Sequence, residues 1–264
     1  MSNQGGRNRL GIQLIIFRDR PRQDLAGVLR DVARAGYEGV EAGNLFREST
    51  PAAVQVLFQE TGLALTGAHA GYGEFADTAK VDENIQFVKA MGARYLMCSG
   101  VADSKSMAGY EQSAELFNRV GRRCRDAGVE FCYHNHNWEF TPFDGQVALH
   151  RLAELTDPET VKFCVDVYWV AVGGEDPAAF IRRYASRIPY FHIKDGQWEA
   201  GHPGKSTRFT ALGAGNVDLP TAVRAAMQVN PEWLVYEQDT SYDRDPVQDA
   251  TESLNYLRKL ARPA

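Results

Sequence analysis

Short apolar runs alternate with amphipathic stretches along almost the whole chain. The runs have the length and composition of buried β-strands and lie at Leu10–Phe17, Gly39–Ala42, Leu63–His69, Tyr95–Cys98, Val129–His134, Val161–Val165, Tyr190–Ile193 and Trp233–Glu237. Between the runs, apolar residues recur three and four positions apart, as Leu25, Val28, Leu29 and Val32 do, which predicts helices. Several of these stretches end in a glycine-containing turn, a common C-terminus of a helix. The pattern predicts eight strand–helix units in succession.

Eight strand–helix units joined by short turns predict parallel strands connected by right-handed crossovers. A closed (β/α)8 TIM barrel holds eight such units in roughly 250 residues, and this chain has 264. The rival fold is an open doubly wound sheet, which is disfavoured because no GxGxxG motif follows the first strand. We see no linker, repeat or low-complexity segment in the sequence. We therefore expect a single domain over residues 1–264, with its core from about residue 10 to 260.

The charge of the chain argues against a nucleic acid partner. The formal net charge is -5, and the 29 Lys and Arg residues are scattered rather than gathered on one segment. Binding to a phosphate backbone needs a basic face. The two longest basic clusters, Arg18 to Arg22 and Arg122 to Arg125, follow a strand and lie on a helix, where we expect solvated faces.

The cysteines and the N-terminus indicate a cytoplasmic protein. Three of the four cysteines, Cys98, Cys132 and Cys164, lie inside or directly after apolar strand-like runs, and no CxxC pair is present. This pattern favours a reducing compartment over a disulfide framework. Residues 1–10 lack the apolar core of a signal peptide, and no stretch has the apolar length of a membrane span.

Polar residues gather where the expected strands end, which is where TIM barrels carry their chemistry. These residues are Glu41, His69, His134, His136, Glu139, Asp166, His192, Lys194, Asp195, Glu237, Gln238 and Asp239. A mixed set of imidazoles and carboxylates suits one divalent ion such as Mn²⁺, Mg²⁺, Co²⁺ or Zn²⁺, and the lack of cysteine at these ends disfavours a structural zinc site. The alternative is a structural salt-bridge network around Lys194.

The end of the fifth strand holds the densest group of polar residues. His134 and His136 are two residues apart, so in an extended strand their side chains share a face. A neutral imidazole titrates near working pH, which makes both histidines candidate proton-transfer bases.

Five segments, in this order, resemble the xylose isomerase-like TIM barrel family, which includes sugar phosphate isomerases and epimerases and the family 2 AP endonucleases. The segments are Tyr133–Phe140, Val165-Asp166 followed by Tyr168-Trp169, Phe191–Asp195, Leu212–Asp218 and Tyr236–Asp239. The resemblance runs from Leu10 to about Leu260. It implies one divalent metal ion, held by a Glu, Asp, His, Glu set from the fifth to eighth strands. Asp166, His192 and Glu237 match the last three positions.

The first ligand position departs from the family pattern. Epimerases of the family carry Glu-Pro-Leu-Asn at the end of the fifth strand, and this chain has His134-Asn135-His136-Asn137. We predict that Glu139 reaches back to the metal, because a carboxylate preserves the charge of the site. The alternative is that His134 or His136 replaces the glutamate.

The resemblance implies proton removal next to a carbonyl, through an enediolate that the metal stabilises. We therefore expect a divalent-metal-dependent isomerase or epimerase of a keto-sugar or keto-inositol, with His134, His136 and Glu237 as catalytic residues. The alternative is a dehydratase, lyase or hydrolase that acts on an inosose or 3-keto-glycoside by the same proton abstraction. A non-catalytic sugar-binding protein is a remote alternative. An endonuclease is disfavoured by the acidic chain and the single ligand set.

The expected partner is a small sugar or cyclitol, with no nucleic acid and no membrane, and a homo-oligomer is left open. We expect five side chains to contact this substrate: His69, Trp138, Tyr168, Lys194 and Asp195. Lys194 follows His192 by two residues, so both should point into the barrel.

Overall fold

Eight parallel strands close into a barrel in the computed structural model of the chain, which describes residues 8–43, 50–199 and 208–261. The barrel strands are β1 (Arg9–Gln13), β2 (Gly39–Ala42), β3 (Ala64–Gly71), β4 (Tyr95–Ser99), β5 (Glu130–His134), β8 (Val161–Asp166), β9 (Tyr190–Ile193) and β12 (Trp233–Tyr236). Each strand pairs with its neighbours in chain order, and β12 pairs with β1 to close the ring. The predicted TIM barrel is confirmed.

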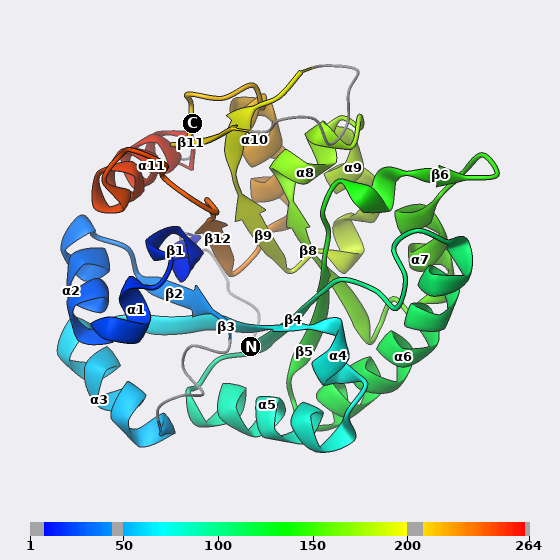
Figure 1. Cartoon of the computed structure of the whole chain (residues 1–264), viewed down its shortest axis with the longest axis horizontal. Coiled ribbons are helices and arrows are strands. Elements are labelled where there is room, and N and C mark those ends of the chain that lie inside the picture. The colour runs from blue at the N-terminus through cyan, green and yellow to red at the C-terminus, as the bar shows by residue number, and fades with distance from the viewer. Residues whose placement is uncertain (1–7, 44–49, 200–207, 262–264) are drawn as a thin grey trace.

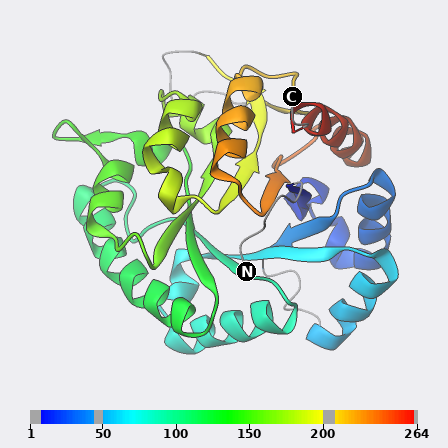
Figure 2. The ribbon, with the colours of Figure 1, turned by 180° about the vertical axis from the view of Figure 1, so that it is seen from behind.

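Helices surround the barrel, as Figure 1 and the reverse view in Figure 2 show. They are α1 (Arg20–Gln23), α2 (Leu25–Ala35), α3 (Pro51–Thr61), α4 (Tyr72–Phe75), α5 (Thr78–Ala90), α6 (Met107–Asp126), α7 (Ala148–Leu155), α8 (Val167–Val172), α9 (Pro177–Tyr184), α10 (Leu219–Val229) and α11 (Pro246–Leu260). Two small hairpins, β6 (Pro142–Phe143) with β7 (Gln146–Val147) and β10 (Asp195–Gln197) with β11 (Arg208–Thr210), follow barrel strands β5 and β9. None of the described helices is long and apolar enough to cross a membrane.

The first strand is shorter than the apolar run that predicts it. The run extends from Leu10 to Phe17, but the strand ends at Gln13 and a 3-10 helix, η1 (Leu14–Phe17), follows. The side chain of Gln13 accepts a hydrogen bond of 2.7 Å from the backbone N–H of Ile15, which caps this turn. Because most of η1 is buried, apolar composition alone did not distinguish it from a continued strand.

The inside of the barrel has its own apolar filling, distinct from the larger core between sheet and helices. Met97, Cys132, Cys164, Tyr190 and Val235 are fully buried and pack together. They come from five strands of a closed ring, so this cluster fills the interior. The four cysteines are buried and unpaired, as expected for a reduced protein. This apolar cluster closes the inside of the barrel beneath the polar residues at the carboxyl ends of the strands.

One prediction concerns the packing of α6 against the segment before β8. A Cβ added to Gly121 would clash with the backbone carbonyl oxygen of Thr160. Alanine gains about 1 kcal/mol over glycine in a helix, but overpacking against backbone costs typically 1–3 kcal/mol. We expect Gly121→Ala to lower the free energy of unfolding by about 1 kcal/mol or more in urea titrations, while the exposed Gln112→Ala on the same helix is neutral. An unchanged or higher midpoint for Gly121→Ala would contradict this packing.

Candidate active site

A cavity of about 430 Å³ opens at the carboxyl ends of the barrel strands. Part of its wall consists of polar side chains from the strand ends, namely His69, Ser99, His134, His136, Glu237 and Asp239. Another part comes from the segment after β1, between Gln13 and Arg22. The position agrees with the general placement of chemistry in this fold.

Four buried side chains bring potential metal ligands together at this cavity. His134, Asp166, His192 and Glu237 each offer one donor atom, and these atoms all lie within 4.8 Å of one another. They come from β5, β8, β9 and the residue after β12, which are successive neighbours around the barrel. Because neighbouring parallel strands have their carboxyl ends at the same end of the barrel, residues that are far apart in sequence lie close together there. We call these four residues the donor group.

Two atoms of the donor group lack the hydrogen bonds that buried polar atoms normally form. Oδ1 of Asp166 accepts from the backbone N–H groups of Tyr168 and Trp169, at 2.9 and 3.1 Å, and so caps α8. Oδ2 of Asp166 is buried and has no hydrogen-bond partner among the described residues. Nδ1 of His192 lies 2.6 Å from Oε2 of Glu237 without the geometry of a hydrogen bond. Unsatisfied ligand atoms that converge in this way fit a bound cation.

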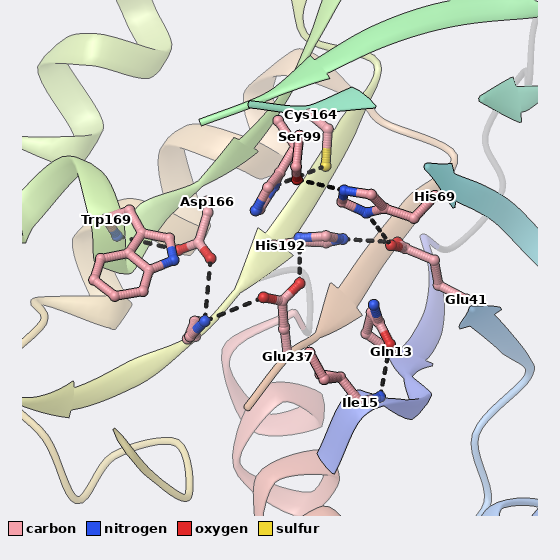
Figure 3. A network of polar contacts seen from close by, with 12 residues as sticks. Gln13, Ile15, Glu41, His69, Ser99, Cys164, Asp166, Trp169, His192 and Glu237 are labelled. Atoms are coloured by element: carbon pink, nitrogen blue, oxygen red, sulfur yellow. Dashed lines mark hydrogen bonds and ion pairs between the residues drawn. The ribbon is translucent and has the colours of Figure 1, made fainter. Parts of the chain in front are cut away.

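Glu41 orients the ring of His192 by contacting the nitrogen that faces away from Glu237. Nε2 of His192 lies 2.7 Å from Oε2 of Glu41, and the hydroxyl of Tyr190 donates to the same oxygen at 2.8 Å. Figure 3 shows His192 between Glu41 and Glu237. Burial alone would raise the pKa of Glu41, but His192 and His69 outweigh it and lower the pKa. A carboxylate bound to one ring nitrogen leaves the other nitrogen for a metal.

His69 connects Glu41 to Ser99 on the cavity wall. Nδ1 of His69 lies 3.1 Å from Oε1 of Glu41, and Nε2 lies 2.5 Å from Oγ of Ser99. Both His69 and Ser99 line the cavity, and substrate contact by His69 stays a prediction. Sequence reasoning missed Ser99, although it directly follows the fourth apolar run. A serine at a strand end has no distinctive chemistry until its histidine neighbour across the sheet is known.

Glu139 lies outside the donor group. After β5 the chain turns into η3 (Trp138–Phe140), where Glu139 is fully buried. Its carboxylate accepts from the hydroxyl of Tyr133 at 2.6 Å and from the backbone N–H of His136 at 2.8 Å. These contacts hold the carboxylate against the β5 turn, and His134 stands in the donor group in its place. Burial raises the pKa of Glu139 to about 7 despite these hydrogen bonds.

Both fifth-strand histidines are neutral over the physiological range. Burial, followed by the positive charge of Lys194, lowers the pKa of His136 to about 3. Burial also lowers the pKa of His134, and His192 acts in the same direction. The ring of His136 stacks on Trp138, which is 37% exposed, with centroids 4.0 Å apart. The sequence suggests that these two histidines titrate near pH 6 to 7. Their burial instead lowers both pKa values below that range.

Lys194 is buried among carboxylates rather than on the cavity wall. Its Nζ lies 2.5 Å from Asp239, 3.1 Å from Glu237 and 3.9 Å from Asp166. Burial would lower the pKa of Lys194, but these carboxylates raise it above the ordinary value. The salt-bridge network considered from the sequence is thus present, and it adjoins the donor group. Lys194 and His192 both approach the carboxylate of Glu237, at 3.1 and 2.6 Å.

Asp195 and Tyr168 are packed away from the cavity wall. The carboxylate of Asp195 accepts from the backbone N–H groups of Gly196, Gly213, Gly215 and Val217, at 2.9 to 3.2 Å. Tyr168 is fully buried, with Trp169, Trp198 and Phe209 around its ring. Neither residue is among those that line the cavity. In this geometry Asp195 holds the loop from Gly213 to Val217, and substrate contact by Asp195 and Tyr168 stays a prediction.

Comparison with known proteins agrees with the fold. Residues 29–260 match the xylose isomerase-like TIM barrel family. The chain belongs to this family. It is 25% identical to an inosose dehydratase of Mesomycoplasma hyopneumoniae strain 7448, over 96% of each chain. It is also 25% identical to an inosose dehydratase of Lacticaseibacillus casei, over 86% of each chain.

Solved structures show the same fold at lower identity. A sugar phosphate isomerase/epimerase from Parabacteroides distasonis superposes with a TM-score of 0.78 and 19% identity, covering 100% of this chain and 99% of the other. A 3-keto-D-glucoside 4-epimerase from E. coli gives a TM-score of 0.75 and 16% identity, covering 96% and 99%. The resemblance seen in the sequence is confirmed. The named relatives are enzymes of two kinds, dehydratases and epimerases.

The raised pKa of Glu139 makes a prediction about stability. The folded state holds this proton up to about pH 7, whereas an unfolded glutamate releases it near 4.3. The stability contributed by the protonated form is therefore lost as pH rises through 7. We expect Glu139→Gln to gain roughly 2–3 kcal/mol relative to the wild type between about pH 5 and pH 8, measured by urea unfolding. The exposed Glu115→Gln serves as control, and an equal pH response in both variants would contradict the assignment.

Proposed function

We propose that the chain binds one divalent metal ion, of the Mn²⁺, Mg²⁺, Co²⁺ or Zn²⁺ class, through the donor group. The observation that carries the proposal is the convergence of His134, Asp166, His192 and Glu237 with two unsatisfied ligand atoms. Two imidazoles and two carboxylates are suitable ligands for these ions. Here His134 takes the position for which the sequence favours Glu139.

Cys164 is a weaker ligand candidate at the same place. Its thiol lies 3.8 Å from Nδ1 of His134, and the two form a second set of three with His192. Burial raises the pKa of Cys164 to about 12, so the thiol stays protonated at neutral pH. Metals bind the thiolate, which leaves Asp166 and Glu237 as the stronger partners for the two histidines.

The reaction proposed for this site begins with removal of a proton next to a carbonyl. A bound divalent ion would polarise the carbonyl oxygen of a substrate. Glu237, a member of the donor group, and His136 both line the cavity and are the candidate proton acceptors. Burial acts to raise the pKa of Glu237, but His192 and Lys194 lower it and keep it a carboxylate. His136 is neutral, and its Nδ1 is buried without a partner.

Loss of water is the outcome that we favour, with a keto-cyclitol or keto-sugar as substrate. The α-proton passes to the base, a carbon–carbon double bond forms, and the β-hydroxyl leaves with a proton as water. Ser99 and His69 are hydrogen-bonded to each other on the cavity wall and would supply that proton. The full-length relatives named inosose dehydratase support this outcome. The absence of a glutamate at the first ligand position also weakens a mechanism with two glutamate bases.

Isomerisation or epimerisation is the second candidate, as the sequence predicts. It starts with the same proton removal but returns the proton to another position or face of the substrate. Two different proton acceptors on the cavity wall, Glu237 and His136, favour this alternative. Both candidates require a keto-sugar or cyclitol and the same metal.

Metal analysis of variants can decide whether His134 or Glu139 is the ligand from the fifth strand. We expect about one divalent ion per chain in protein purified without chelator, measured by inductively coupled plasma mass spectrometry. Because each donor-group residue supplies a ligand, Asp166→Asn and His134→Gln should lose most of the ion, by about tenfold or more in affinity. Glu139→Gln should retain it. Loss of the ion in Glu139→Gln together with retention in His134→Gln would reverse the assignment.

The reaction prediction separates dehydration from epimerisation. Wild-type protein with its metal is incubated in D₂O with an inosose and with a panel of keto-sugars and their acids and phosphates, and products are followed by NMR. Dehydration gives an unsaturated product, whereas epimerisation gives a stereoisomer with deuterium at the reacting carbon. We expect His136→Gln to keep its metal and to lose about 10²–10⁴-fold in rate. Full activity in that variant would remove His136 from the mechanism, and no turnover across the panel would contradict the proposed function.

A further inference from the structure

One wall of the cavity holds an arginine in a backbone conformation that is costly for any residue but glycine. Arg18 has φ 53° and ψ -121° at the end of η1. Buried residues flank it on both sides, Ile16 and Phe17 before it and Pro21 after it. Its own N–H bonds to the carbonyl oxygen of Ile15 at 2.9 Å. Strain of this kind persists only where the surroundings hold it, and it is common at functional sites.

The strained backbone directs a charged side chain to the cavity. Arg18 lines the cavity, and its Nη1 donates to the backbone carbonyl oxygen of Asp239, another lining residue, at 3.2 Å. Within residues 8–43, 50–199 and 208–261, Arg18 forms no ion pair. A guanidinium has five N–H donors, so most remain available to a ligand. Arg22 lines the same cavity and forms an ion pair of 3.6 Å with Asp19.

The cavity therefore carries negative charge near the donor group and positive charge on the wall formed by the segment after β1. The carboxylates of Asp166 and Glu237 in the donor group and that of Asp239 lie around Lys194. Arg18 and Arg22 belong to the wall formed by the segment after β1. An anionic group on a substrate would be repelled by the carboxylates and attracted by the arginines. The planar fork of a guanidinium matches a carboxylate or phosphate by two parallel hydrogen bonds.

We propose that Arg18, supported by Arg22, binds an oxyanion of the substrate, so that the natural substrate is a keto-sugar or cyclitol acid or phosphate. The inference rests on the proposed function, because it takes this cavity as the substrate site. It orients the molecule, with its anionic group at the arginines and its carbonyl at the donor group. It also corrects the expectation that the cluster from Arg18 to Arg22 is only a solvated face, since two of its arginines line the cavity.

Binding of three unreactive sugars tests the proposal without turnover. The probes are D-glucose 6-phosphate, D-glucuronate and D-glucose, titrated calorimetrically into the purified protein. We expect one of the two anionic probes to bind at least about tenfold more tightly than glucose, which corresponds to the strength of a charge-assisted bidentate contact. The preferred probe identifies phosphate or carboxylate as the source of the oxyanion. Arg18→Gln should remove the advantage, and the exposed Arg30→Gln on α2 should keep it.

A glycine variant separates ligand binding from a structural role. Arg18→Gly relaxes the positive φ while it removes the guanidinium, so its melting temperature should equal or exceed that of the wild type. The advantage of the anionic probe should still be lost. Equal affinity for all three probes, no binding of either anion, or an advantage that survives in Arg18→Gln would each overturn the inference. Metal content depends on the donor group, so these results leave the proposed metal site and its chemistry to be judged by their own measurements.

Discussion

The compensation of buried negative charge at the mouth of the barrel governs the rest of the site. Glu41, Asp166 and Glu237 are buried close to one another, where water cannot screen their repulsion. The buried ammonium of Lys194 offsets part of this charge, and His192 forms ion pairs with both Glu41 and Glu237. Removal of one partner from such a network typically costs about 3–5 kcal/mol. Lys194 is therefore as much a condition for the fold of this region as a feature of its chemistry.

A divalent cation bound by the donor group would complete this balance. Among the described residues, Oδ2 of Asp166 has no hydrogen-bond donor, and burial raises the pKa of this side chain. Glu41 and the N-terminus of α8 orient His192 and Asp166 from outside the group, so the site is preorganised by residues that need not touch the metal.

The sequence predicted the barrel because the order of strands in a closed parallel sheet follows the order of the chain. It also predicted most of the donor group, since Asp166, His192 and Glu237 lie at or directly after strand ends and must converge. It did not predict His134 over Glu139, because the choice depends on how the chain turns after β5, where Tyr133 and an amide take up the glutamate. Ser99 and Arg18 were missed for a related reason. Their partners are set by sheet register and by an unusual backbone turn, neither of which leaves a pattern in composition.

The anchoring of one loop by Asp195 has a consequence for how this enzyme fold diversifies. Asp195 holds the segment from Gly213 to Val217 through backbone N–H groups alone. Apart from Gly213, with its φ of 87°, and Gly215, which has no room for a side chain, the identity of the loop residues is irrelevant to the anchor. The loop after β9 can accumulate substitutions while the strand that carries His192 and Lys194 stays in place. Substitutions on the rim can thus alter what the cavity accepts without displacing the side chains of the donor group beneath it.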